Sequence, residues 1–179
     1  IVAPDTSPRG EGVPDDAEGA YDFGLGAGFY VNATEEPWAK HYRMYDYIID
    51  ELPQLVNELF PVDSSRQGIF GHSMGGHGAL SIALKNPKQF RSVSAFAPIS
   101  SPINCPWGVK ALSAYLGDYL DDNCENWRAY DSCELIKTAD KPMPMLVDQG
   151  GADDFLQEQL KPELLVKAAA DNNYPLTHR

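Results

Sequence analysis

The sequence predicts an α/β fold in which a mostly parallel sheet carries helices on both faces. Short apolar strands alternate with helical segments along the chain, and one serine lies in a tight turn between such a strand and such a helix. At 179 residues the chain suits one domain, which buries roughly 70% of its unfolded surface. We therefore expect residues 1–179 to form a single domain.

The first third of the chain contains a long loop and a long helix. Residues 4–37 are rich in Gly, Pro, Asp and Glu but also hold four aromatic residues, which predicts an ordered surface loop. From His41 to Phe60 the apolar positions recur at helical spacing. One face of this helix should lie on a sheet, and Pro53 should kink it.

The later elements follow from short apolar runs and from Gly and Pro at their ends. We expect strands at 67–71, 92–97, 143–147 and 176–179, and helices at 75–86 and 157–170. Residues 98–140 mix Pro, Gly, Trp and Cys with short helical stretches such as Val109 to Leu116. They are predicted to form an insertion over the C-terminal edge of the sheet, where active sites of such sheets lie.

Charge and cysteine content restrict the partners of this protein. A net charge of −12 argues against nucleic acid or an anionic membrane as a partner, because phosphate groups are bound by clustered Lys and Arg. No apolar run approaches the roughly 20 residues of a membrane span. The three cysteines are an odd number without zinc-like spacing, which predicts reduced thiols and a cytoplasmic protein.

The segment Gly71-His72-Ser73-Met74-Gly75 is a G-x-S-x-G motif between a predicted strand and a predicted helix. This context is that of a nucleophile elbow, so we expect the α/β-hydrolase fold with Ser73 as nucleophile. Gly71 and Gly75 should be needed where a Cβ would collide with neighbouring backbone. The following helix directs its first N–H groups toward the developing oxyanion, and the backbone N–H of Met74 is the first donor.

A serine nucleophile needs a histidine base and an acid that orients it, in the chain order Ser, acid, His. Asp148, Asp153 and Asp154 follow the strand at 143–147, and the loop pair is favoured over Asp148. Capping of the next helix is the alternative role for that pair.

None of the four histidines suits the base. His41 and His72 precede Ser73, His77 lies one helical turn beyond it, and His178 is expected within a strand. His77 is predicted to be a structural histidine, and the His72 side chain should point away from that of Ser73. The apolar residues 1–3 read as the end of a buried strand, so we expect the chain to begin within the fold.

The sequence also resembles the S-formylglutathione hydrolase (esterase D) family. The matching segments run in family order across nearly the whole chain: VAPDTSPRG (2–10), GAGFYVNAT (26–34), YRMYDYIIDELP (42–53), GHSMGGHGAL (71–80), SVSAFAPIS (92–100), CPWG (105–108) and DQGGADDFL (148–156). By position, the resemblance assigns Ser73 as nucleophile, Met74 as oxyanion donor and Asp153 as acid. It places the histidine beyond Arg179 and the second oxyanion donor before Ile1, so the chain is expected to be incomplete at both termini and inactive alone.

The resemblance implies hydrolysis of S-formylglutathione to glutathione and formate through a formyl-serine, as a step of formaldehyde detoxification, with no metal or cofactor. A formyl group is small, so we expect a tight acyl pocket with Trp107 as its wall, or Trp38 as the alternative. A general carboxylesterase or acyltransferase, and a non-catalytic hydrolase-fold interaction protein, are the competing functions. The sequence does not determine the oligomeric state, and a homodimer is the assembly considered for this chain.

Overall fold

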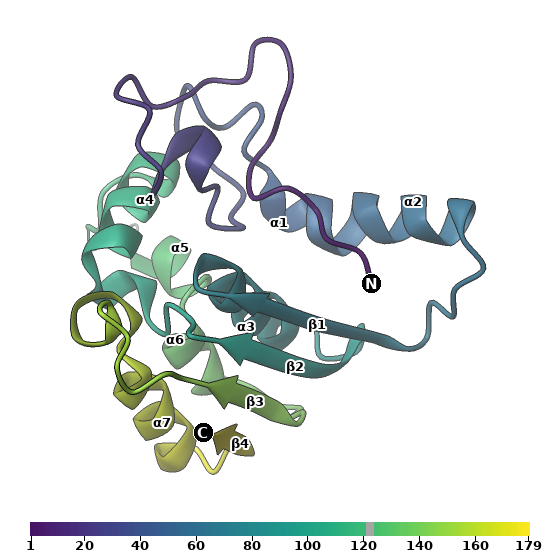
Figure 1. Ribbon diagram of the computed structural model, residues 1–179, viewed down its shortest axis with the longest axis vertical. Helices are drawn as coiled ribbons and strands as arrows, with labels where there is room; N and C mark the ends of the chain where they lie inside the picture. The colour runs from purple at the N-terminus through teal and green to yellow at the C-terminus, as the bar shows by residue number, and fades with distance from the viewer. Residues whose placement is uncertain (121–123) are drawn as a thin grey trace.

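The computed structural model describes residues 1–120 and 124–179, and in this part it contains a four-stranded sheet (Figure 1). The strands lie in the order β1-β2-β3-β4, and their bounds are β1 Gln67–His72, β2 Phe90–Phe96, β3 Met145–Asp148 and β4 Leu176–His178. All three neighbouring pairs are parallel, as predicted. Their C-terminal ends therefore meet at one edge of the sheet, where His72 pairs with Phe96 and Phe96 pairs with Asp148.

Helices precede the sheet, connect its strands and form the insertion. They are α1 Met44–Asp46, α2 Leu52–Leu59, α3 Met74–Lys85, α4 Pro106–Leu116, α5 Cys124–Arg128, α6 Ser132–Ile136 and α7 Pro162–Asp171. The helix predicted at 157–170 is interrupted, because Lys161 adopts a left-handed conformation with φ of 46°. It separates the π-helical turn Leu156–Leu160 from α7, whose first residue, Pro162, fits the first turn of a helix.

One face of the sheet is covered by α3, α6 and α7. Leu80 and Ala83 from α3 are buried against Val93 and Ala95 of β2, and α6 and α7 extend the same apolar core over β3. Val93 and Ala95 share one face of β2 because successive side chains along a strand point to opposite faces of the sheet. On the other face Phe70 and Phe96 are 58% and 38% exposed, so the described helices do not cover it at these positions.

The helix predicted from His41 to Phe60 forms and faces strand β1, but a cavity separates it from the sheet. It widens to a π-helical turn at Tyr47–Glu51, two residues before Pro53, and α2 contains no buried residue. Its side chains instead line one wall of a cavity whose opposite wall is β1. The periodicity correctly indicated an apolar face, but it did not specify what that face would contact.

The long loop at 4–37 is ordered by a second apolar core above the sheet edge. Phe23 packs against Trp38 and Tyr115, with ring centroids 4.8 Å and 4.9 Å away. The buried Tyr115 hydroxyl donates to the carbonyl of Ala27 at 2.8 Å and accepts from the N–H of Gly24 at 3.0 Å. Its burial raises the pKa of Tyr115 well above the ordinary value. The phenol therefore ties the loop to α4 as a neutral group.

The insertion at 98–140 lies on the side toward which the strand arrows point, where Figure 1 shows α4 and α5. A fully buried carboxylate, that of Asp131, holds its two ends together. It accepts from the Ser101 hydroxyl at 2.7 Å and from the N–H of Cys133 at 2.9 Å, so it caps α6 while binding the segment before α4.

Candidate active site

Ser73 occupies the turn between β1 and α3 with φ 54° and ψ −116°. A non-glycine residue in this region is strained by roughly 1–3 kcal/mol, and the neighbouring structure has to hold it there. The Ser73 N–H donates to the carbonyl of Phe96 at 2.9 Å. The Ser73 carbonyl accepts from the N–H of His77 at 3.0 Å and from that of Ile99 at 3.3 Å. Strand β2 and helix α3 together fix the elbow.

The two glycines of the motif differ in what they do. A Cβ on Gly71 would lie 2.1 Å from the carbonyl oxygen of Gly75, so only glycine fits at that position. A Cβ on Gly75 would have no heavy atom within 4 Å, which shows that our expectation for Gly75 was wrong. Gly76 is the second position where a side chain would collide, because a Cβ there would lie 2.9 Å from the Cβ of Pro98.

Helix α3 begins at Met74 without a side-chain cap. The first N–H groups of such a helix have no intrahelical partner, and with the helix dipole they favour a negative charge. Met74 follows Ser73 directly, so its N–H belongs to this end of the helix. An anion formed beside Ser73 would be stabilised by these groups.

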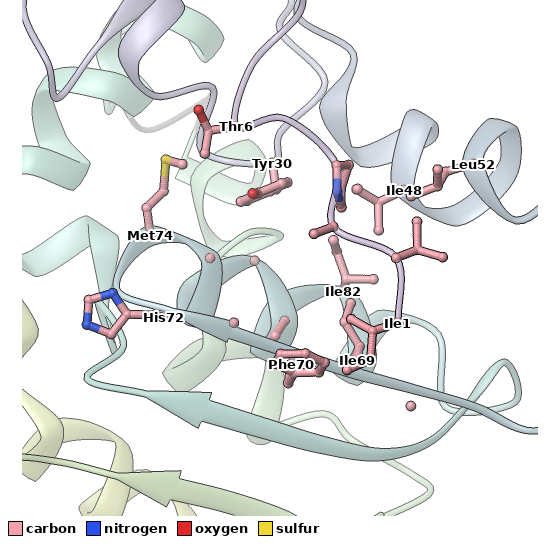
Figure 2. Close-up of a pocket in the computed structure, with 18 of the residues that line it drawn as sticks. Ile1, Thr6, Tyr30, Ile48, Leu52, Ile69, Phe70, His72, Met74 and Ile82 are labelled. Carbon is pink, nitrogen blue, oxygen red and sulfur yellow. The ribbon is translucent and has the colours of Figure 1, made fainter.

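Ser73 and Met74 lie at the wall of an open cavity of about 770 Å³ between β1, α2 and the first residues of the chain. Figure 2 shows this cavity, with Met74 and Tyr30 on the α3 side and Ile48 and Leu52 on the α2 side. Most of its lining is apolar, and Trp107 also reaches it. A small acyl substrate could therefore meet Ser73 from this side.

Trp107 and Trp38, the two predicted candidates for the acyl wall, have different environments. Trp107 is partly exposed, lines the cavity, and packs against Phe155 at a centroid distance of 4.8 Å. Trp38 is only 9% exposed and contacts Phe23, Tyr42 and Tyr115 in the core. The geometry therefore separates a cavity residue from a packing residue, which the sequence could not do.

The three candidate acids are distributed around the end of β3. The Asp148 carboxylate accepts from the Arg179 guanidinium at 2.7 Å. One carboxylate oxygen of Asp153 accepts from the N–H of Phe155 at 2.9 Å, and Asp154 is exposed. The bond to Phe155 is a local turn contact, because the helical turn that follows has Phe155 as its N-cap and no side-chain cap bond, and it uses only one of the two carboxylate oxygens.

None of the four histidines, all of which lie in the described residues, has a hydrogen bond to the Ser73 hydroxyl. His77 is fully buried, and its Nε2 donates to the carbonyl of Phe29 at 3.0 Å, while its Nδ1 has no partner. Burial lowers the pKa of His77 to about 4, so the ring is neutral at pH 7. His77 is thus the structural histidine that was predicted, and His72 is exposed (Figure 2).

The buried cysteines are poor candidates for a nucleophile. Cys105 and Cys133 are 1% and 8% exposed, and no described cysteine forms a disulfide. Burial raises the pKa of Cys105 to about 11 and that of Cys133 further. Thiols in such surroundings remain protonated and unreactive.

Two residues of the site gave no clear sequence pattern. Tyr30 lies on the cavity wall with φ of 53°, and a Cβ on Gly78 would lie 2.4 Å from its ring. Gln159 accepts from the N–H of Trp107 at 3.0 Å. The one indication for Gln159 in the sequence was that a polar residue interrupts apolar positions at helical spacing. Polar residues in such a pattern are common on the solvated face of a helix, so this indication was weak.

Residues 1–120 and 124–179 contain no group of three or more His, Cys, Asp or Glu placed to hold a metal ion. Within the same residues, no helix has both the length and the apolar character needed to cross a membrane.

Comparison with known proteins shows the relationships of this chain. The family model described as putative esterase matches residues 1–178. S-formylglutathione hydrolases of Rattus norvegicus and Mus musculus are each 52% identical over 181 residues, covering 100% of this chain and 62% of theirs. The solved structure of an S-formylglutathione hydrolase from Agrobacterium tumefaciens matches with a TM-score of 0.90 and 51% identity, covering 97% of this chain and 61% of that chain.

The chain thus spans 62% of the length of the two curated relatives. Its parallel sheet, its helices and its strand-turn-helix serine agree with these matches and with the α/β-hydrolase fold. On the family match over residues 1–178, this chain belongs to the esterase family.

Proposed function

We propose that this protein hydrolyses S-formylglutathione to glutathione and formate, with Ser73 as the nucleophile. The observation that carries the proposal is the conformation of Ser73, which holds a serine on the wall of an apolar cavity and at the N-terminus of α3. The names of the relatives in rat, mouse and Agrobacterium tumefaciens support this choice of substrate.

In the proposed reaction the Ser73 Oγ attacks the formyl carbon and a general base removes its proton. The resulting oxyanion is stabilised by the N–H of Met74 and by a second backbone donor. Collapse of the tetrahedral intermediate breaks the C–S bond, and glutathione leaves as a thiolate. The pKa of its conjugate thiol is near 8.5, so the leaving group needs little assistance from an acid, and the protonated base then returns a proton to it. Water then attacks the formyl-serine, releases formate and restores the serine.

The base is proposed to be a histidine oriented by Asp153, whose second carboxylate oxygen is available for this bond. A base must lie within hydrogen-bond reach of the serine hydroxyl. His77 cannot turn toward Ser73 without losing its bond to Phe29, and His178 lies in β4, where it pairs with Val147 of β3. We therefore assign the base to a histidine other than the four in residues 1–179.

Release of glutathione from S-formylglutathione by the full-length gene product tests the proposal. Ser73→Ala should lower kcat by at least about a thousandfold, because the nucleophile is lost while the cavity remains. Ser92→Ala, an exposed serine on β2, is the matched control and should retain full activity.

Other outcomes would assign another function. Hydrolysis of simple esters without hydrolysis of the thioester would identify a general carboxylesterase or acyltransferase. Absence of both activities, together with no labelling of Ser73 by a fluorophosphonate, would identify a non-catalytic protein. Unchanged thioester hydrolysis in Ser73→Ala would refute the proposed role of this serine.

A further inference from the structure

Helix α4 starts without a cap of its own. Its N-cap residue, Cys105, makes no side-chain capping bond, and Pro106 has no N–H. The first donor of the helix is therefore the N–H of Trp107, and it donates to Oε1 of Gln159 at 3.0 Å. A residue that lies 52 positions further along the chain thus supplies the cap.

Gln159 is well placed for this role. Its side chain is 7% exposed and belongs to the π-helical turn Leu156–Leu160, which follows Asp153 in sequence. The same turn is tied to the loop after β2, because the carbonyl of Leu160 accepts from the N–H of Ser100 at 2.9 Å. A neutral amide oxygen can satisfy a buried N–H without bringing a charge into the interior.

The indole of Trp107 is held from the same segment. The ring of Phe155 packs against it at a centroid distance of 4.8 Å with an interplanar angle of 47°. Tyr21 approaches edge-on with a centroid distance of 6.2 Å. Residues 153–160 therefore carry the proposed acid, Asp153, and also both groups that fix the backbone and the ring of Trp107.

We propose that Gln159 is a positioning residue that fixes Trp107 as the wall of the Ser73 cavity and thereby limits the length of the acyl group. This inference rests on the proposed function. Without the Gln159 acceptor, the N–H of Trp107 keeps only the weak sulfur acceptor of Cys105, and the first turn of α4 is free to shift. The indole would then move from the cavity wall and admit longer acyl chains.

The test compares kcat/KM for p-nitrophenyl acetate and p-nitrophenyl butyrate in the full-length gene product. Gln159→Met has similar length but no strong acceptor, and it should reduce the acetate-to-butyrate ratio at least fivefold. Gln157→Met is the matched control, since Gln157 is exposed on the same turn, and it should leave the ratio within twofold of wild type. Trp107→Ala should also lower the ratio, and adding Gln159→Met to it should produce no further change.

A second readout does not depend on activity. Hydrogen exchange at the amide of Trp107 should be at least tenfold faster in Gln159→Met than in wild type and unchanged in Gln157→Met. If Gln159→Met fails to fold, Phe155→Leu loosens the same ring from a half-exposed position and should lower the acetate-to-butyrate ratio.

The outcomes separate the two proposals. The positioning role would be overturned if the wild type is active and Gln159→Met leaves the acetate-to-butyrate ratio unchanged. It would also be overturned if Gln159→Met lowers this ratio as much in the Trp107→Ala background as in the wild type. Unchanged exchange at Trp107 would also overturn it. A wild type inactive toward S-formylglutathione and both esters would refute the proposed function, while the exchange measurement would still decide whether Gln159 holds Trp107.

Discussion

The Nε2–H of His77 donates to the carbonyl of Phe29 at 3.0 Å, inside a region that water does not reach. This bond joins the first turns of α3 to the long loop at the point where Phe29 and Tyr30 both have positive φ values, 52° and 53°. The bond also selects the tautomer, because a carbonyl can only accept.

His77 should make the protein less stable in acid. Its pKa is about 4 in the folded state and about 6.5 in the unfolded state, so the unfolded chain binds the proton first as the pH falls. Stability is therefore lost from about pH 6.5 down to pH 4, by about 2–3 kcal/mol from this group. In His77→Gln, which is neutral at every pH, this part of the loss should disappear when urea unfolding is compared at pH 7 and pH 4.5.

The exposed His178→Gln variant is the control for that comparison and should keep the wild-type pH dependence. Equal pH dependence in His77→Gln and wild type would mean that His77 is not responsible.

The two glycines around Ser73 should respond oppositely to alanine. Gly71→Ala places a Cβ 2.1 Å from the carbonyl oxygen of Gly75, and the free energy of unfolding should fall by about 3 kcal/mol or more. Gly75→Ala meets open space within α3, where alanine favours a helix, so the change should be about 1 kcal/mol or less. Thermal unfolding of the two variants measures the difference, and equal losses would contradict this account of the elbow.

Substitution of Trp38 should mainly lower stability, and substitution of Trp107 should mainly change the selectivity for acyl groups. Trp38→Ala removes a ring that is 9% exposed among three aromatic partners, so it should cost about 3–5 kcal/mol of stability. Trp107→Ala should cost less than about 2 kcal/mol, since that ring is partly exposed, and should increase the relative rate on longer acyl esters. A Trp107→Ala variant with unchanged acyl preference would exclude Trp107 as the wall.

The three thiols should differ in their rates of alkylation. Cys105 and Cys133 are buried and have raised pKa values, whereas Cys124 is partly exposed. Brief treatment of the folded protein with iodoacetamide, followed by peptide mapping, should modify mainly Cys124, and denaturant should make all three react. Fast modification of Cys105 in the folded protein would contradict its burial and reopen a role for this thiol.

Local patterns were sufficient to predict much of this fold. Each predicted strand forms within a few residues of its expected ends. An apolar run bounded by Gly and Pro predicts a strand from residues that are close together in the sequence. Ser73 could be located in the same way, since an elbow requires only a strand, a tight turn and a helix in succession. The structural role of His77 was also predicted from its place on the helix.

Contacts between distant segments could not be read from those patterns. The apolar face of α2 lines a cavity instead of covering the sheet, and Lys161 breaks a helix that spacing alone would continue.

Among the site residues, the sequence determined that Ser73 is held in an elbow and that Trp107 and Trp38 were the two candidates for a wall. Only the tertiary structure placed Trp107 at the cavity and Trp38 in the core, and brought Gln159 to the start of α4. The physical reason is one of range: backbone preference and apolar period act within a few residues, whereas a cap supplied from 52 residues away depends on how the whole chain packs.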